Sequence, residues 1–117
     1  MQMALTRNFK HTVMERVNRE PAFARALLDE ASTLFLNGEP ETARLILRDL
    51  VNATIGFESL AETVGVPPKS LHRMLSERGN PSMNNIAAIF TALSKALHVQ
   101  IATCLVEKKQ RGKAVIY

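Results

Sequence analysis

The chain has 117 residues, of which 46% are apolar and only 5% aromatic. This length suffices for one compact domain over residues 1–117, whose core has to be built from aliphatic side chains. No apolar run is long enough to span a membrane, and we expect no secretory signal, so a cytoplasmic location is predicted. The single cysteine, Cys104, excludes an internal disulfide and fits a reducing compartment.

The formal net charge of +4 is unevenly distributed along the chain. Residues 1–62 contain seven Lys and Arg against nine Asp and Glu, whereas residues 63–117 contain eight against two. The basic half indicates a polyanionic partner, and the acidic half then has a different task. Charge alone does not identify that partner, because many basic proteins never bind nucleic acid.

Apolar residues at helical spacing predict an all-α fold, a compact helical bundle. Pro21 and Pro40 suit first helical turns, Asn37-Gly38 and Gly56 suit helix ends, and Ser82 suits the start of the last helix. The expected helices are residues 8–18, 21–36, 40–55, 57–64, 68–77 and 82–97. On the second of them, the expected inward stripe is Phe23, Leu27, Ala31 and Leu34.

Beyond His98 the pattern changes to the alternation that is typical of a strand. Val99, Ile101, Thr103 and Leu105 would share one face of it, and Cys104 would be a small packed side chain on the other. For residues 98–117 we therefore expect either a short strand, which residues 114–117 would complete as a hairpin, or a basic tail.

The segment most informative about function is residues 57–76, FESLAETVGVPPKSLHRMLS. A helix-turn-helix packs two helices at a steep angle across a short turn. It needs a small residue at the crossing, a residue that accepts positive φ four positions later, and apolar side chains closing the wedge from both sides. A single alignment of the motif with the sequence meets all of these requirements, with Leu60, Ala61, Val64, Gly65, Val66, Leu71 and Met74. The alternative is an ordinary helical hairpin, which shares part of the pattern.

If the motif binds DNA, its second helix, residues 68–77, enters the major groove. The candidate contacts are Pro68, Lys69, Ser70, His72, Arg73, Ser76 and Arg78. Arg73 is the best candidate for reading guanine, because a guanidinium can bond O6 and N7 together. Lys69 would reach a base or a phosphate, and Ser70 with the first-turn amides would hold phosphate. His72 is either a DNA contact or a solvated side chain, and Arg78 and Asn84 would contact phosphate.

Residues 59–97 resemble the Xre/Cro-like helix-turn-helix regulators, whose fold is lambda-repressor-like. The likeness lies in Leu-Ala-Glu-Thr-Val-Gly-Val, residues 60–66. Residues 70–76, SLHRMLS, and 79–82, GNPS, are similar to HigA-type antitoxins, the antidote proteins of toxin–antitoxin modules. The resemblance implies a homodimer that binds an operator in double-stranded DNA, and a RelE/ParE-type toxin as a further partner. Two positions depart from the family: Pro67-Pro68 replaces the usual Ser or Thr cap, and Phe57 stands where many relatives carry Gln to grip phosphate.

Other functions are less well supported by the sequence. His11, His72 and His98 are far apart and Cys104 has no companion, so we expect no metal, no cofactor and no enzymatic activity. The alternative to a regulator is a protein–protein interaction module, a toxin-neutralising antitoxin with little or no DNA binding. The amino-terminal helices, residues 8–54, would then bind the toxin or a second copy; packing around a small core is their simpler interpretation.

Overall fold

The computed structural model describes residues 12–108, and within that range the chain is all-α, as the sequence predicts. One helix includes residues 12–19. Five more follow: α2 (Pro21–Leu36), α3 (Pro40–Ala53), α4 (Phe57–Val64), α5 (Pro68–Met74) and α6 (Met83–Ala96). In this part of the chain, no helix is both long and apolar enough to cross a membrane.

The residues that begin these helices are those that the sequence indicates. Pro21, Pro40 and Pro68 each occupy a first helical position, where the missing N–H costs no hydrogen bond. Ser82 caps α6, because its hydroxyl oxygen accepts the N–H of Asn85 at 3.1 Å. The starts of these helices are therefore determined by the local sequence.

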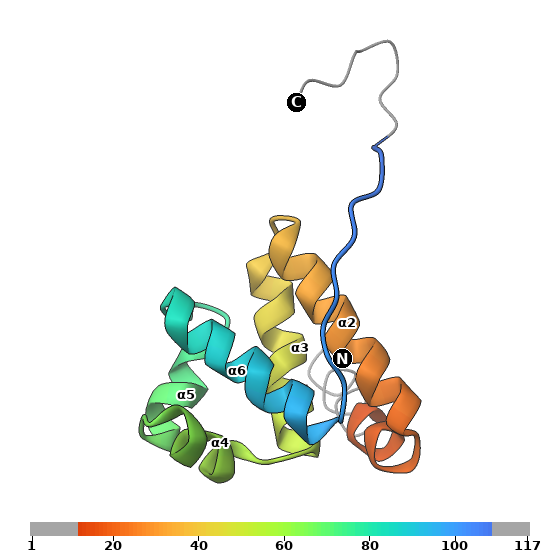
Figure 1. The fold of residues 1–117 in the computed structure, drawn as a ribbon. Coiled ribbons are helices and arrows are strands. Elements are labelled where there is room, and N and C mark those ends of the chain that lie inside the picture. Colours follow the sequence, from red (N-terminus) through yellow and green to blue (C-terminus); the bar gives the residue numbers. More distant parts are fainter. Residues whose placement is uncertain (1–11, 109–117) are drawn as a thin grey trace, which may run out of the picture.

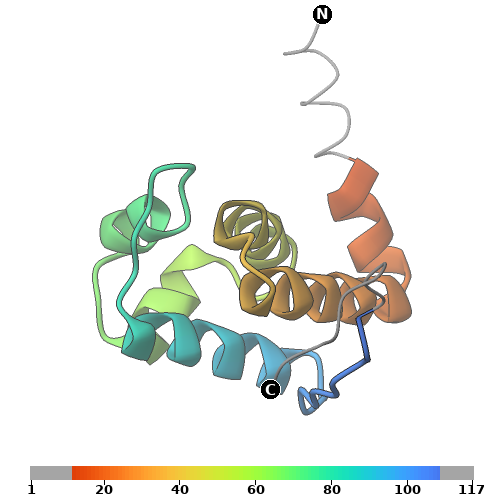
Figure 2. The ribbon, with the colours of Figure 1, turned by 90° about the horizontal axis from the view of Figure 1, so that it is seen from above.

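The helices are arranged as a hairpin with a smaller unit beside it. α2 and α3 run antiparallel and pack along most of their length, while α4 and α5 lie together to one side (Figure 1). α6 crosses in front of α3 and packs on α4, so it closes the core between the two parts; Figure 2 shows the same arrangement from above. The largest fully buried side chains come from five helices and the turn after α5: Leu28, Leu47, Leu50, Val51, Leu60, Leu71, Leu75, Ile89 and Leu93.

The buried stripe of α2 differs from the expected one. Ala24, Leu28 and Ala31 are buried, whereas Phe23 and Leu27 are only partly covered. The stripe is therefore rotated by about one residue. The ring of Phe23 makes a cation–π contact with the guanidinium of Arg16, whose Cζ lies 4.0 Å from the ring centroid. An apolar pattern with several adjacent candidates does not fix which of them faces the core.

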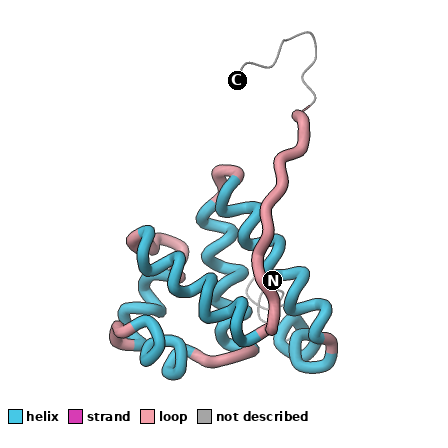
Figure 3. Tube along the Cα trace, viewed as in Figure 1, coloured by secondary structure: helices cyan, strands magenta, loops and turns pink. Residues whose placement is uncertain are grey.

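The expected carboxyl-terminal strand is absent from the described residues. Residues 99–108 form an extended loop without ladder hydrogen bonds (Figure 3), and residues 114–117 of the expected hairpin lie outside the described range. The alternating apolar residues are packed only at the start of the segment, where Val99 and Ile101 contact the core, whereas Leu105 is fully exposed. No other strand is present in this range to pair with the segment, and an isolated extended chain gains no ladder. Cys104 is exposed, so its expected packing is wrong as well.

Candidate nucleic-acid interface

The turn between α4 and α5 depends on the backbone of Gly65. Its φ and ψ are 85° and 31°, in the left-handed region that side chains with a Cβ disfavour. This conformation lets the N–H groups of Gly65 and Val66 both donate to the carbonyl of Ala61, at 2.8 and 3.2 Å. The chain thereby leaves α4 and enters α5 within three residues, 65–67.

Apolar side chains hold the two short helices together. Leu60 and Leu71 are completely buried, Ala61 is 4% exposed, and Val64, Val66 and Met74 pack against the same core. The six expected wedge residues other than Gly65 therefore lie between α4, α5 and the rest of the core, and Gly65 is exposed in the turn. Leu75 and Phe57 are buried there too, although the sequence pattern did not include them.

The outward face of α5 carries the basic residues that the sequence singles out. Pro68, Lys69, His72 and Arg73 are exposed, and Arg78 is exposed in the turn that follows the helix. Lys69 and Arg73 are four residues apart, so they lie one above the other on the same face. This pair is the most basic feature of the two-helix unit.

The two serines in the expected set are less available than the basic residues. Ser70 and Ser76 are both half-buried. The Ser76 hydroxyl donates to the carbonyl of Arg73 at 2.7 Å, so its proton is used within the helix end. The N–H of Ser70 donates to the carbonyl of Pro67 at 3.0 Å. With Pro67 and Pro68 lacking N–H groups altogether, the first turn of α5 is a poor cradle for phosphate.

His72 does not stand free in solvent. Its ring stacks on that of Phe57, with centroids 3.9 Å apart and planes inclined by 16°. Phe57 is itself 6% exposed, so the stack anchors α5 to the first turn of α4. The stack fixes the direction of the imidazole at the edge of the basic face, a role that spacing along the sequence did not suggest.

α5 is shorter than the expected helix 68–77, because it ends at Met74. The turn that follows is bound by Arg44 of α3, a residue that is only 8% exposed. Its Nε donates to the carbonyl of Ser76 at 3.2 Å and its Nη2 to that of Glu77 at 3.0 Å. These two carbonyls are therefore held by α3, and that of Ser76 also accepts the N–H of Gly79 at 3.0 Å. Gly79 completes the turn, because a Cβ there would collide with the carbonyl of Met74.

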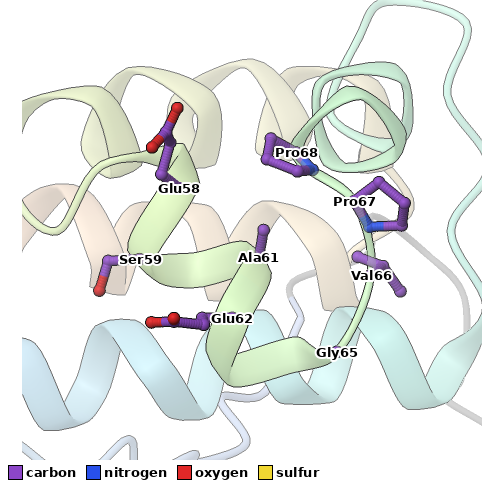
Figure 4. A pocket seen from close by; sticks show the side chains of 8 residues that line it. All are labelled: Glu58, Ser59, Ala61, Glu62, Gly65, Val66, Pro67 and Pro68. Carbon is purple, nitrogen blue, oxygen red and sulfur yellow. The ribbon is translucent and has the colours of Figure 1, made fainter.

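An acidic cleft lies directly beside the basic face, and sequence reasoning missed it. Glu58 and Glu62 are exposed on one side of α4, and Gly65, Pro67 and Pro68 lie opposite (Figure 4). The cleft has a volume of about 730 Å³ and opens to solvent. Carboxylates at this spacing repel a phosphate that approaches over α4. The available signal was two glutamates four residues apart on the outward face of the first motif helix.

The remaining expected residues lie around this unit. Asn84 is exposed in the first turn of α6, after the cap at Ser82. His98 is exposed at the far end of α6, and His11 lies outside the described residues. Within residues 12–108, no group of three His, Cys, Asp or Glu side chains is arranged to hold a metal ion.

We compared the chain with protein-family models, with curated proteins and with solved structures, and none of these matches it.

Proposed function

We propose that this protein is a sequence-specific DNA-binding regulator of the Xre and HigA-antitoxin type, and that α5 enters the major groove. The observation that carries the proposal is the two-helix unit itself. Gly65, in the left-handed conformation, joins two short helices that pack together through the buried Leu60 and Leu71. The second of these helices exposes Lys69 and Arg73 to solvent. A helix presented in this way is the reading element of a helix-turn-helix.

Three exposed basic residues on and just after α5 have distinct parts in this proposal. Arg73 reads guanine, because its guanidinium can donate to O6 and N7 together. Lys69, one turn earlier, contacts a base or a phosphate, and Arg78 contacts phosphate. The first turn of α5 offers few N–H donors to phosphate, and the carboxylates of α4 repel it. These three basic side chains therefore have to supply most of the attraction to DNA.

The proposed complex has two copies of the chain on one operator. A second copy would place a second α5 about one helical turn of DNA away, which a pair of half-sites requires. The RelE/ParE-type toxin that the resemblance implies stays a prediction, and so does the absence of an enzymatic activity.

A second candidate function is favoured by the acidic cleft. Glu58 and Glu62 stand next to the expected DNA surface, and Pro67-Pro68 removes two N–H donors from it. Both features weaken phosphate binding, as in a helix-turn-helix that serves only protein–protein interaction. Lys69 and Arg73 favour DNA over this candidate, because interface cores are depleted of Lys.

The test is a titration of the purified protein into labelled DNA from upstream of its own gene, beside a scrambled duplex, at several salt concentrations. We expect selective, salt-dependent binding, with Arg73→Ala losing about 1–3 kcal/mol of discrimination. Arg19→Ala, an exposed arginine far from α5 along the chain, is the matched control and should bind as the wild type does. Equal affinity for both duplexes, unchanged by Arg73→Ala, contradicts the proposal and favours the second candidate.

A further inference from the structure

An apolar groove lies between the end of α2 and the start of α6, away from the helix-turn-helix. Its volume is about 340 Å³. Ser32 is the one polar residue of its lining, and the hydroxyl of that serine donates to the carbonyl of Asp29 at 2.8 Å. The other lining residues are apolar: Phe35 and Phe90, with ring centroids 5.9 Å apart, and Leu36, Met83, Ile86, Ala87 and Ile101. None of the groove residues belongs to α4 or α5.

Exposed apolar side chains gather at this groove and in the segment that leaves it. Among residues 12–108, the exposed large hydrophobic residues are Leu36, Leu45, Met83, Leu105 and Val106. Leu36 and Met83, at 65% and 84% exposure, line the groove, while Leu105 and Val106, at 100% and 82%, follow it along the chain. A concentration of this kind is typical of an interaction surface, whereas single exposed apolar residues are ordinary.

The chain does not cover this groove with its own described tail. Ile101 packs at the groove, but every residue from Ala102 to Lys108 is exposed, and the segment runs away from the helices (Figure 3). The segment is extended and has no ladder partner within the described residues. A chain in this state offers unpaired backbone groups and two uncovered aliphatic side chains to another surface.

We propose that residues 102–106 of a second copy occupy the α2–α6 groove, and that the exchange is reciprocal. Leu105 and Val106 of each copy cover the apolar wall formed by Leu36, Met83 and Phe90 of the other. Each copy thus has both surfaces of the interface, an apolar segment and an apolar groove, and neither is covered within that copy. Because each copy gives one tail and receives one, a two-fold axis closes the assembly with no groove left open. Both α5 helices remain outside the contact.

The oligomeric state of the full chain tests this interface, measured by sedimentation over a range of concentrations. Ala87→Glu puts a carboxylate at an exposed position of the groove wall on a helix that tolerates Glu, and Leu105→Asp puts one on the tail. Since covering a leucine side chain stabilises a contact substantially, we expect each variant to raise the dimer dissociation constant at least about tenfold. Ala26→Glu, the same change at an exposed α2 position outside the groove, is the control and should leave it unchanged. A monomeric wild type, or variants that dimerise as tightly as the control, overturns the proposal.

Cross-linking tests which surfaces meet. Cys104 is the only cysteine and is exposed in the tail, so Met83→Cys adds one thiol at the groove. When ¹⁴N- and ¹⁵N-labelled copies are mixed and treated with a short bismaleimide, we expect a product of twice the 13.0 kDa chain mass in which residue 83 of one copy is joined to residue 104 of the other. Glu41→Cys, an exposed position on α3, is the control and should give no such link. Links from residue 83 that stay within one copy, or a yield no greater than the control's, contradict the exchange.

Discussion

Arg44 connects α3 to the end of the candidate recognition helix, and its replacement by methionine should destabilise the protein by about 2 kcal/mol. The guanidinium donates to the carbonyls of Ser76 and Glu77 at 3.2 and 3.0 Å from a site that is 8% exposed. Hydrogen bonds from a charged donor are worth about 1.5–3 kcal/mol each. Glu77 is exposed and its carbonyl has access to water, and methionine ends the desolvation of a buried charge, so we expect less than the full sum.

Thermal unfolding followed by circular dichroism measures this loss. For a chain of this length, about 2 kcal/mol lowers Tm by about 8 °C. Arg48→Met is the matched control, because it removes the same charge from α3 and its guanidinium makes no hydrogen bond within the described residues. The reasoning is refuted if Arg44→Met melts within about 2 °C of the wild type, or no lower than Arg48→Met.

Three further predictions concern the two-helix unit. Gly65→Ala should lower the free energy of unfolding by about 1 kcal/mol in urea titrations, because a Cβ there meets no atom within 4 Å and the cost is conformational alone; an unchanged midpoint would contradict this. His72→Ala should cost about 1 kcal/mol by the same measurement through loss of the stack on Phe57, and a neutral result would mean that the stack contributes nothing. The double variant Glu58→Gln, Glu62→Gln should raise the affinity for scrambled DNA about threefold at low salt, because the charges that repel phosphate beside α5 are removed. An unaltered affinity would mean that DNA does not approach this side of α4.

Local chemistry in the sequence was enough to predict the helices and the wedge. Pro21 and Pro40 start helices and Ser82 caps one, because each acts on its own first turn. Gly65 is equally local, since only a glycine takes its φ at little cost. The spacing from Ala61 to Gly65 then determined which apolar residues lie between α4 and α5.

Contacts between distant parts of the chain were not predictable in this way. Arg44 binds the turn after α5 from 32 and 33 positions away, so nothing in residues 68–77 signals this contact. The same holds for the stack of His72 on Phe57, which needs the angle between two helices. Of the two alternatives for the tail, the strand is not formed in the described residues, because alternation predicts a strand only where a neighbouring strand exists to pair with it.

The most direct test of DNA binding through α5 is to map the contact surface by NMR. The ¹⁵N-labelled protein would be titrated with a short duplex from upstream of its gene, and amide shifts followed for each residue. We expect the largest changes at Lys69, Arg73 and Arg78 on and after α5, with α2 and α3 nearly unchanged. Shifts centred on α2 and α3, or none at a concentration where the duplex is bound, would contradict the central proposal.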